Sequence, residues 1–313
     1  MPTPVESFLK EITGPNGSID LSTLKPLGGG GTHDIYRSDK YPGLLLKVMR
    51  DTTRMKDDER AEHLDKLTGQ YSALYEAFGE SRCIMEKHSI QSIQSDTNEL
   101  PQQFIVSVVP FDPCFGSDEK FGFNVESEEL NETLIQSKRY LYEMTNKSLL
   151  GSNEKSNPYV IRNYPLLNKN FDKIFKLLDT EPSLLAPMRE FLTKYKSFYK
   201  ESGILLDTIG FDNVLFYKND EGWQFKLGSV IKHDNGALTK EMLEKIVENP
   251  ATVKESFEYY TSVYYMPACI RALNACAEKV GIEKIIDDIS INDKTIDTLA
   301  QMHVQLNILK HDI

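Results

Sequence analysis

The sequence predicts an α+β protein with two lobes, a β-rich N-terminal lobe and a helical C-terminal lobe. Short apolar runs bounded by turn residues are concentrated between residues 24 and 112. From about residue 126 onward the pattern is mostly that of helices. The length of 313 residues suits two lobes, at roughly 150 residues per domain, or one large α/β unit. We therefore expect an N-terminal lobe over 1–112 and a C-terminal lobe over 113–313.

The N-terminal lobe contains two clear strand signals and one helix signal. LLLKVM at 44–49 follows the turn residues 41–43, and QFIVSVVPF at 103–111 follows Pro101. Between them, residues 56–79 carry apolar side chains at helical spacing, namely Leu64, Leu67, Tyr71, Leu74, Tyr75 and Phe78. The pattern therefore predicts a β-rich lobe with one packed helix.

The C-terminal lobe is predicted to consist of helices interrupted by one β-hairpin. Helices are expected at about 126–148, 165–179 and 182–201, and Gly203 should end the third. A β-hairpin region is expected over 203–231, built from ILLD, NVLFYK and WQFKLGSV with a turn at 219–222. Helices resume at about 239, with breaks at Pro250, Gly281 and Asn292.

Charge and composition exclude several classes of partner. The chain has 47 acidic and 36 basic residues, a formal net charge of -11, which argues against nucleic acid and anionic membranes as partners. No apolar run reaches the ~18–20 residues of a membrane span, and the N-terminus does not resemble a secretory signal. Four scattered cysteines are typical of a reduced, cytoplasmic protein. The six histidines lack metal-site spacing.

The segment LGGGGTHDIYR at 27–37 is the most informative. Four consecutive glycines allow the backbone to approach a bulky anion closely. Lys47 follows Ile35 by 12 residues and lies in an apolar strand. A single ammonium group beneath a glycine loop suits the phosphates of a nucleotide such as ATP. A flexible turn followed by a lysine at a strand edge would give the same pattern, so both interpretations stand at this point.

These motifs resemble those of the protein-kinase superfamily, in particular small bacterial kinase-like proteins of the YrbL type. LGGGGTHDIY is similar to the glycine-loop pattern LGxGxxGxVY, with His33 in place of the third glycine. LLLKVM is similar to the VAIK strand, and residues 203–215 align without a gap on GIVHRDLKPENIL. The resemblance covers residues 24–235 and implies a bilobal kinase-like fold with a helical C-terminal extension.

The resemblance implies a nucleotide site and assigns residues to it. Val108 to Asp112 would form the hinge between the lobes, at the adenine edge. Gln70 takes the place of the helix glutamate that pairs with the lysine. The implied nucleotide-binding residues are Gly28, Gly30, Gly31, Lys47, Gln70 and Val109.

The catalytic motifs depart from the family pattern. The gapless alignment puts Thr208 at the position of the catalytic base and keeps Asn213 as a metal ligand. Ser229 replaces the aspartate that holds Mg²⁺, and a neutral hydroxyl is a poor ligand for that ion. This reading implies a pseudokinase, or a regulatory or binding module, with little phosphotransfer.

A shifted alignment gives the alternative. Moving it by one residue makes Asp207 the base, and a longer second strand makes Asp234 the metal carboxylate, with Asp212 nearby. The chain would then be an active atypical ATP-dependent phosphotransferase, acting with Mg²⁺ or Mn²⁺ on a protein or a small molecule.

Other sites fit the sequence less well. A dinucleotide-binding fold needs a helix after the glycines, whereas IYR indicates a strand, and the hydrolase pattern GxSxG is absent. The tyrosine-rich segment 257–276 either packs in the helical core or offers a protein partner a surface on the C-terminal lobe.

Overall fold

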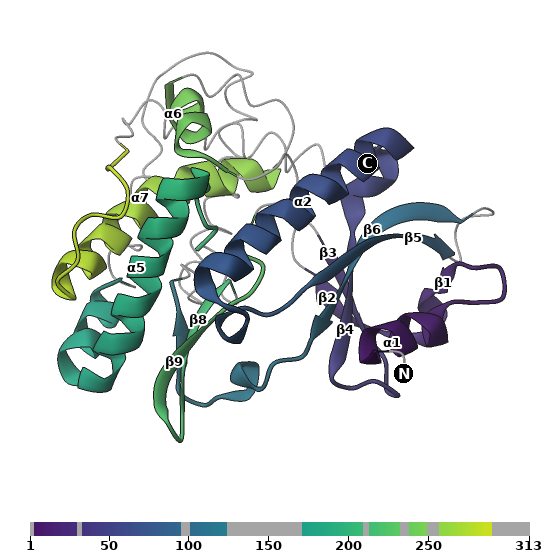
Figure 1. Cartoon of the computed structure of the whole chain (residues 1–313), viewed down its shortest axis with the longest axis horizontal. Coiled ribbons are helices and arrows are strands. Elements are labelled where there is room, and N and C mark those ends of the chain that lie inside the picture. Colours follow the sequence, from purple (N-terminus) through teal and green to yellow (C-terminus); the bar gives the residue numbers. More distant parts are fainter. Residues whose placement is uncertain are drawn as a thin grey trace, which may run out of the picture. The chain divides into compact units, whose positions relative to one another are not determined.

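The computed structural model describes residues 3–29, 33–94, 101–123, 171–208, 213–231, 238–248 and 257–289. It is a mixed α+β structure that divides into two compact units, the first extending to Gly116 and the second beginning at Ser117. Each unit has its own sheet, and the sheet of the first unit is strongly curled (Figure 1).

The sheet of the first unit has six strands in the order β1-β5-β6-β4-β3-β2. All neighbouring strands are antiparallel except β1, which is parallel to β5. The strands are β1 (Ile19–Asp20), β2 (Lys25–Gly29), β3 (His33–Arg37), β4 (Leu44–Met49), β5 (Lys87–Gln94) and β6 (Gln102–Pro110). The predicted strands at 44–49 and 103–111 are confirmed as β4 and β6.

Helix α2 (Asp57–Phe78) connects β4 to β5 and confirms the helix predicted over 56–79. Its first turn carries three acidic residues, which stabilise the positive end of the helix dipole. It ends at Gly79, which adopts a φ of 85° that favours glycine. One face of the helix is buried and packs against β5, through side chains that include Tyr71 and Leu74.

Helix α1 (Pro4–Ile12) was not expected from the sequence. The signal for it is a capping box, in which Thr3 and Glu6 each accept a hydrogen bond from the other's main-chain N–H. Pro4 at the first helical position starts the helix, as proline often does. Phe8 and Ile12 are buried against the sheet.

The two faces of this sheet differ in character. One face packs on α1 through an apolar cluster of Phe8, Ile12, Ile19, Leu24, Leu46, Val48, Ile93, Val106 and Val108. Because side chains alternate along a strand, Lys47 lies on the opposite face from Leu46 and Val48. That face is partly covered by α2, since the rings of Tyr71 and His88 lie 4.9 Å apart.

The second unit contains a three-stranded antiparallel sheet, β7 (Lys120–Gly122), β8 (Val214–Asn219) and β9 (Gly222–Leu227). The predicted hairpin is confirmed: Asn219 pairs with Gly222 across the turn, and the side chain of Asn219 accepts a bond from Glu221 N–H. Aromatic rings pack the sheet onto the helices, with neighbouring centroids 5.6–5.9 Å apart among Phe123, Phe171, Phe191, Phe216 and Phe225.

In the described part of the second unit, the α-helices are residues 171–180, α5 (Leu185–Ser202), α6 (Lys240–Glu248) and α7 (Phe257–Lys279). Gly203 and Gly281 have positive φ angles of 70° and 76°, as expected where helices end. ILLD forms one isolated bridge, Ile204 with Thr239, instead of a strand, because its four N–H groups bond to acceptors in different parts of the unit. The helix expected at 126–148 and the breaks at Pro250 and Asn292 lie outside the described residues.

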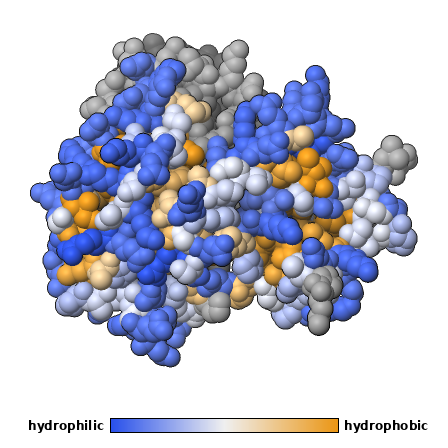
Figure 2. Space-filling model, viewed as in Figure 1, coloured by the Kyte–Doolittle hydropathy of each residue, from blue (hydrophilic) through white to orange (hydrophobic). Residues whose placement is uncertain are grey.

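The surface of the drawn face is mostly hydrophilic, with hydrophobic side chains in small groups (Figure 2). Among the helices described, none combines the length and the apolar character that a membrane span requires.

Candidate nucleotide-binding and catalytic-loop sites

Gly28 and Lys47, two of the residues expected to contact phosphate, lie in one row across the first sheet. Gly28 is opposite Ile35, Ile35 is opposite Lys47, and Lys47 is opposite Ser107. Ser107 is in turn opposite His88 on β5. Directly opposite residues share a face of the sheet. The fold therefore brings Gly28 and Lys47 onto one face of the sheet, two strands apart.

Lys47 is held by a buried carboxylate. Its Nζ lies 2.9 Å from Oε1 of Glu86, and Ser107 Oγ donates to Oε2 of Glu86 at 3.0 Å. The Glu86 side chain is 1% exposed and that of Lys47 is 14% exposed. His88 Nε2 lies 3.5 Å from the same carboxylate. We call Lys47, Glu86, His88, Ser107 and the neighbouring His33 the Lys47 cluster.

Glu86 is the functional candidate that the sequence reasoning missed. The alignment put Gln70 in the place of the lysine's partner, whereas the carboxylate that the structure gives Lys47 comes from the segment entering β5. Gln70 lies at a half-buried position on α2. A lone glutamate between the apolar pair Ile84-Met85 and a strand is the signal that could have found it, since buried acids are rarely unpaired.

The cluster keeps Glu86 ionised and His33 neutral. Burial alone would raise the pKa of Glu86, but the charge of Lys47 and hydrogen bonding with His88 outweigh it and hold that pKa well below its usual range. Burial lowers the pKa of His33 to about 4, although the charge of Glu86 acts in the opposite direction. At neutral pH the pair Lys47–Glu86 is therefore the charged centre of the cluster.

The predicted hinge, Val108 to Asp112, overlaps the last three residues of β6. Val109 is 3% exposed and pairs with Leu45 in the sheet, and the N–H of Phe111 donates to the Gly43 carbonyl at 2.9 Å. Phe111 is 49% exposed, as is Leu27 just before Gly28. These are the exposed large apolar side chains among the described residues. Contact of Val109 with an adenine edge stays a prediction.

In the second unit, Asp207 and Asn213, two residues of the predicted catalytic loop, are joined by a hydrogen bond. Asn213 Nδ2 donates to the Asp207 carbonyl at 3.0 Å. Asp207 N–H donates to the Val230 carbonyl at 2.7 Å, and Gly228 N–H donates to the Asn213 carbonyl at 2.8 Å. Ser229 lies in the chain between Gly228 and Val230, the two residues that make these bonds. Gly30, Gly31, Asp212 and Asp234 lie outside the described residues.

Burial separates the two candidates for the catalytic base. Thr208 is completely buried, whereas Asp207 and Ser229 are half-buried. Burial raises the pKa of the Cys269 thiol to about 12, and the negative charge of Asp207 adds to that rise. Asp207 is therefore more exposed to solvent than Thr208.

The donors at this point do not by themselves fit a magnesium ion. Asn213 and Ser229 offer an amide and a hydroxyl, and Mg²⁺ in proteins is usually held by at least one carboxylate besides phosphates. No group of three or more histidine, cysteine or acidic side chains that could hold a metal occurs in the described part of the chain.

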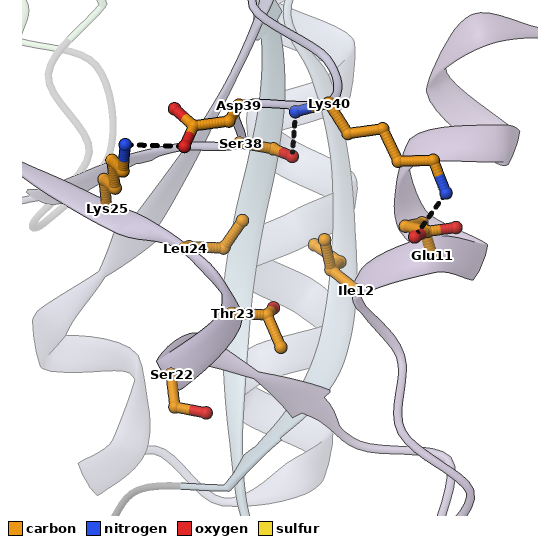
Figure 3. Close-up of a pocket in the computed structure, with 9 residues that line it drawn as sticks. All are labelled: Glu11, Ile12, Ser22, Thr23, Leu24, Lys25, Ser38, Asp39 and Lys40. Carbon is orange, nitrogen blue, oxygen red and sulfur yellow. Dashed lines mark hydrogen bonds and ion pairs between the residues drawn. The ribbon is translucent and has the colours of Figure 1, made fainter.

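An open pocket of about 370 Å³ lies elsewhere in the first unit, between α1, the start of β2 and the turn after β3 (Figure 3). Lys25 pairs with Asp39 and Lys40 pairs with Glu11 at its rim. Because the rim charges neutralise each other and none of the Lys47 cluster lines it, we do not assign it to nucleotide binding.

Comparison with known proteins adds one weak likeness. No family model matches the sequence, and no curated protein matches it. Among solved structures, an ethanolamine kinase of Plasmodium vivax is similar over 98% of this chain and 88% of its own, with 13% identity and a TM-score of 0.27. At that TM-score the two folds are not shown to correspond, so the interpretation depends on the residues described above.

Proposed function

We propose that the chain is a kinase-fold protein whose first unit binds a nucleotide such as ATP. The row that places Gly28 and Lys47 on one face of the sheet carries this proposal. Protein kinases cover the phosphates with a glycine-rich loop and contact them with a lysine on the third strand. Counted from β2, Lys47 is on the third strand, and a paired carboxylate orients it. Cytoplasmic location and a protein partner for the second unit stay predictions.

The second unit supports a binding or regulatory role with little phosphotransfer, a pseudokinase. Thr208 is buried, and Asn213 with Ser229 offers no carboxylate for a metal ion. Efficient phosphotransfer uses a base near the acceptor and Mg²⁺ across the phosphates. We therefore derive no catalytic step through a metal in this chain.

A second candidate function is an atypical phosphotransferase. The specific observation in its favour is that Asp207, the base of the shifted alignment, is more exposed than Thr208 and is bonded through its carbonyl to Asn213. This candidate also needs Asp234 as the metal carboxylate, and its acceptor would be a protein or a small molecule.

A thermal-shift titration with ATP, with and without Mg²⁺ or Mn²⁺, tests the proposal. Binding to the folded state alone raises stability by ~2.7 kcal/mol at a ligand concentration a hundredfold above Kd. We expect ATP to raise the melting temperature equally with and without the metal. No shift at any concentration would contradict nucleotide binding, and a shift that requires the metal would favour the phosphotransferase.

A further inference from the structure

The lysine of the proposed nucleotide site is held from the sheet and not from the helix. Glu86 directly precedes β5, Lys47 is on β4 and Ser107 is on β6. β5 and β4 both pair with β6 through continuous antiparallel ladders. Lys47 and Ser107 lie directly opposite each other in the ladder of β4 with β6, and Glu86 is one residue before the ladder of β5 with β6 begins at Lys87.

Helix α2 contributes less directly. The Tyr75 hydroxyl accepts a hydrogen bond from Glu86 N–H at 2.9 Å, and Tyr71 packs on the ring of His88. The first contact involves the main chain of Glu86, and the second involves its neighbour His88. The carboxylate bonds to Lys47 and Ser107 do not pass through the helix.

In protein kinases, by contrast, the lysine pairs with a glutamate of the helix, and the position of that helix controls activity. We propose that Glu86 is the positioning residue for Lys47 and that it holds the amine ready for a nucleotide phosphate whatever the position of α2. The proposal rests on the proposed nucleotide site. It means that a partner which displaces α2 cannot switch this site off by breaking the lysine–glutamate pair.

The environment of Glu86 agrees with this role. A buried carboxylate with a cationic partner and a hydroxyl donor stays ionised at neutral pH, so the amine is drawn to one place. A phosphate that arrives over Gly28 would meet an ammonium group already fixed on the same face of the sheet, which lowers the entropic cost of binding.

Calorimetric titration of the full chain with ATP and with adenosine tests the role. Lys47 would contact phosphates only, so a positioning defect should weaken ATP binding and spare adenosine binding. We expect Glu86→Gln to lower the affinity for ATP about tenfold, the scale of one charge-assisted contact, with adenosine unchanged. The matched control is Glu62→Gln, which removes the same charge from a surface pair with Lys66 on α2 and should change neither affinity.

Tyr75→Phe tests independence from the helix, because it removes the bond between α2 and Glu86 N–H. We expect a change in ATP affinity of less than about threefold, below the effect of a lost charged contact. A loss as large as that of Glu86→Gln would overturn the helix-independent part of the proposal. An equal loss of ATP and adenosine in Glu86→Gln would show a structural role instead.

Failure of the inference and failure of the proposed function give different results. A wild-type chain that binds neither ligand overturns the proposed function, and the inference with it. Wild-type binding that Lys47→Met weakens and Glu86→Gln leaves intact overturns the inference alone. If urea unfolding shows that Glu86→Gln is unfolded, Glu86→Asp replaces it in the calorimetric titration, since the shorter acid should keep the fold and still weaken ATP binding more than adenosine binding.

Discussion

The side-chain amide of Asn213 donates a hydrogen bond to the main-chain carbonyl of Asp207, with 3.0 Å between Nδ2 and O. The same loop is fixed at both ends to the chain after β9, through the bonds of Asp207 N–H to Val230 and of Gly228 N–H to Asn213. Main-chain groups therefore set the position of Asp207. Its carboxylate can be altered without removing any of these bonds.

Introducing a carboxylate at Thr208 should unfold the second unit and not restore a kinase site. Thr208 is completely buried, so an aspartate there would be a buried charge without a partner. We expect Thr208→Asp to lower the free energy of unfolding by more than about 3 kcal/mol. Ser229→Asp, at a half-buried position, should cost less than about 1 kcal/mol. Urea unfolding followed by circular dichroism measures both.

Thr208→Val is the control for that comparison, because it keeps the shape of the side chain and removes only the hydroxyl. We expect it to change stability by less than about 1.5 kcal/mol. A folded and stable Thr208→Asp variant would show instead that position 208 has access to solvent, as the gapless kinase alignment requires.

Removing the lysine of the cluster should destabilise the first unit as well as its ligand binding. Lys47→Met leaves Glu86 as a buried carboxylate that has lost its cationic partner. Breaking a buried pair from one side costs about 3–5 kcal/mol, whereas removing both charges often costs far less. We expect Lys47→Met/Glu86→Leu to be more stable than Lys47→Met. Denaturant midpoints of the two variants test this, and additive losses would contradict coupling between the two residues.

His33 should make stability depend on pH in the mildly acidic range. Its pKa in the folded chain is about 4, below the ordinary value of 6.5, mainly because of burial. Between these values the unfolded chain binds a proton that the folded chain does not, so stability falls as the pH falls through this window. From pH 7 to pH 5 we expect a loss on the order of 1 kcal/mol.

The variant His33→Gln isolates this effect, because it removes the titrating ring and keeps a polar side chain. Its urea midpoint should fall less than that of the wild type between pH 7 and pH 5. Glu86 contributes to the pH dependence of stability mainly below pH 5, since its pKa is held under its ordinary value of 4.5. If the urea midpoints of the wild type and His33→Gln fall equally between pH 7 and pH 5, His33 is already charged in the folded state or exposed.

Two glycines of the first unit should respond to alanine in opposite directions. Gly28 has a φ of 107°, which L-residues rarely adopt, so Gly28→Ala should cost about 1–3 kcal/mol although no atom blocks the new methyl group. Gly69 is in the middle of α2 with open space around it, and Gly69→Ala should stabilise by about 0.5–1 kcal/mol. Thermal unfolding of both variants checks the signs.

The sequence could predict the elements that carry strong local signals. β4, β6, α2, α5 and the β8–β9 hairpin have periodic apolar residues and turn residues at their ends, and all five were predicted close to their bounds. β5 was missed because KHSIQSIQ has only two apolar residues and no strict alternation. Helix α1 was missed because its signal is a capping pair, which is easily read as an irregular terminus.

The sequence could predict only those site residues whose type and immediate neighbours are distinctive. Four glycines and a lysine in an apolar strand are conspicuous, and Gly28 and Lys47 do share a face of the sheet. The partner of Lys47 could not be read from the sequence, because Glu86 is 39 residues away along the chain and reaches it through the pairing of β5 with β6. Likewise, the burial of Thr208 depends on packing within the second unit.

The role of Asp207 decides between the two proposed functions. With Thr208 buried, Asp207 is the described acid that can serve as the base beside Asn213. If the chain transfers phosphate, Asp207→Asn should reduce the rate by about 10²–10⁴, the contribution of general base catalysis, and leave ATP affinity unchanged. Asp220→Asn makes the same substitution on the exposed hairpin turn and should have no effect.

For the wild type we expect no detectable incorporation of labelled phosphate, with Mg²⁺ or with Mn²⁺, under conditions where an active kinase is readily measured. Wild-type transfer that Asp207→Asn abolishes and Asp220→Asn retains would replace the pseudokinase proposal with the phosphotransferase and place its base at Asp207.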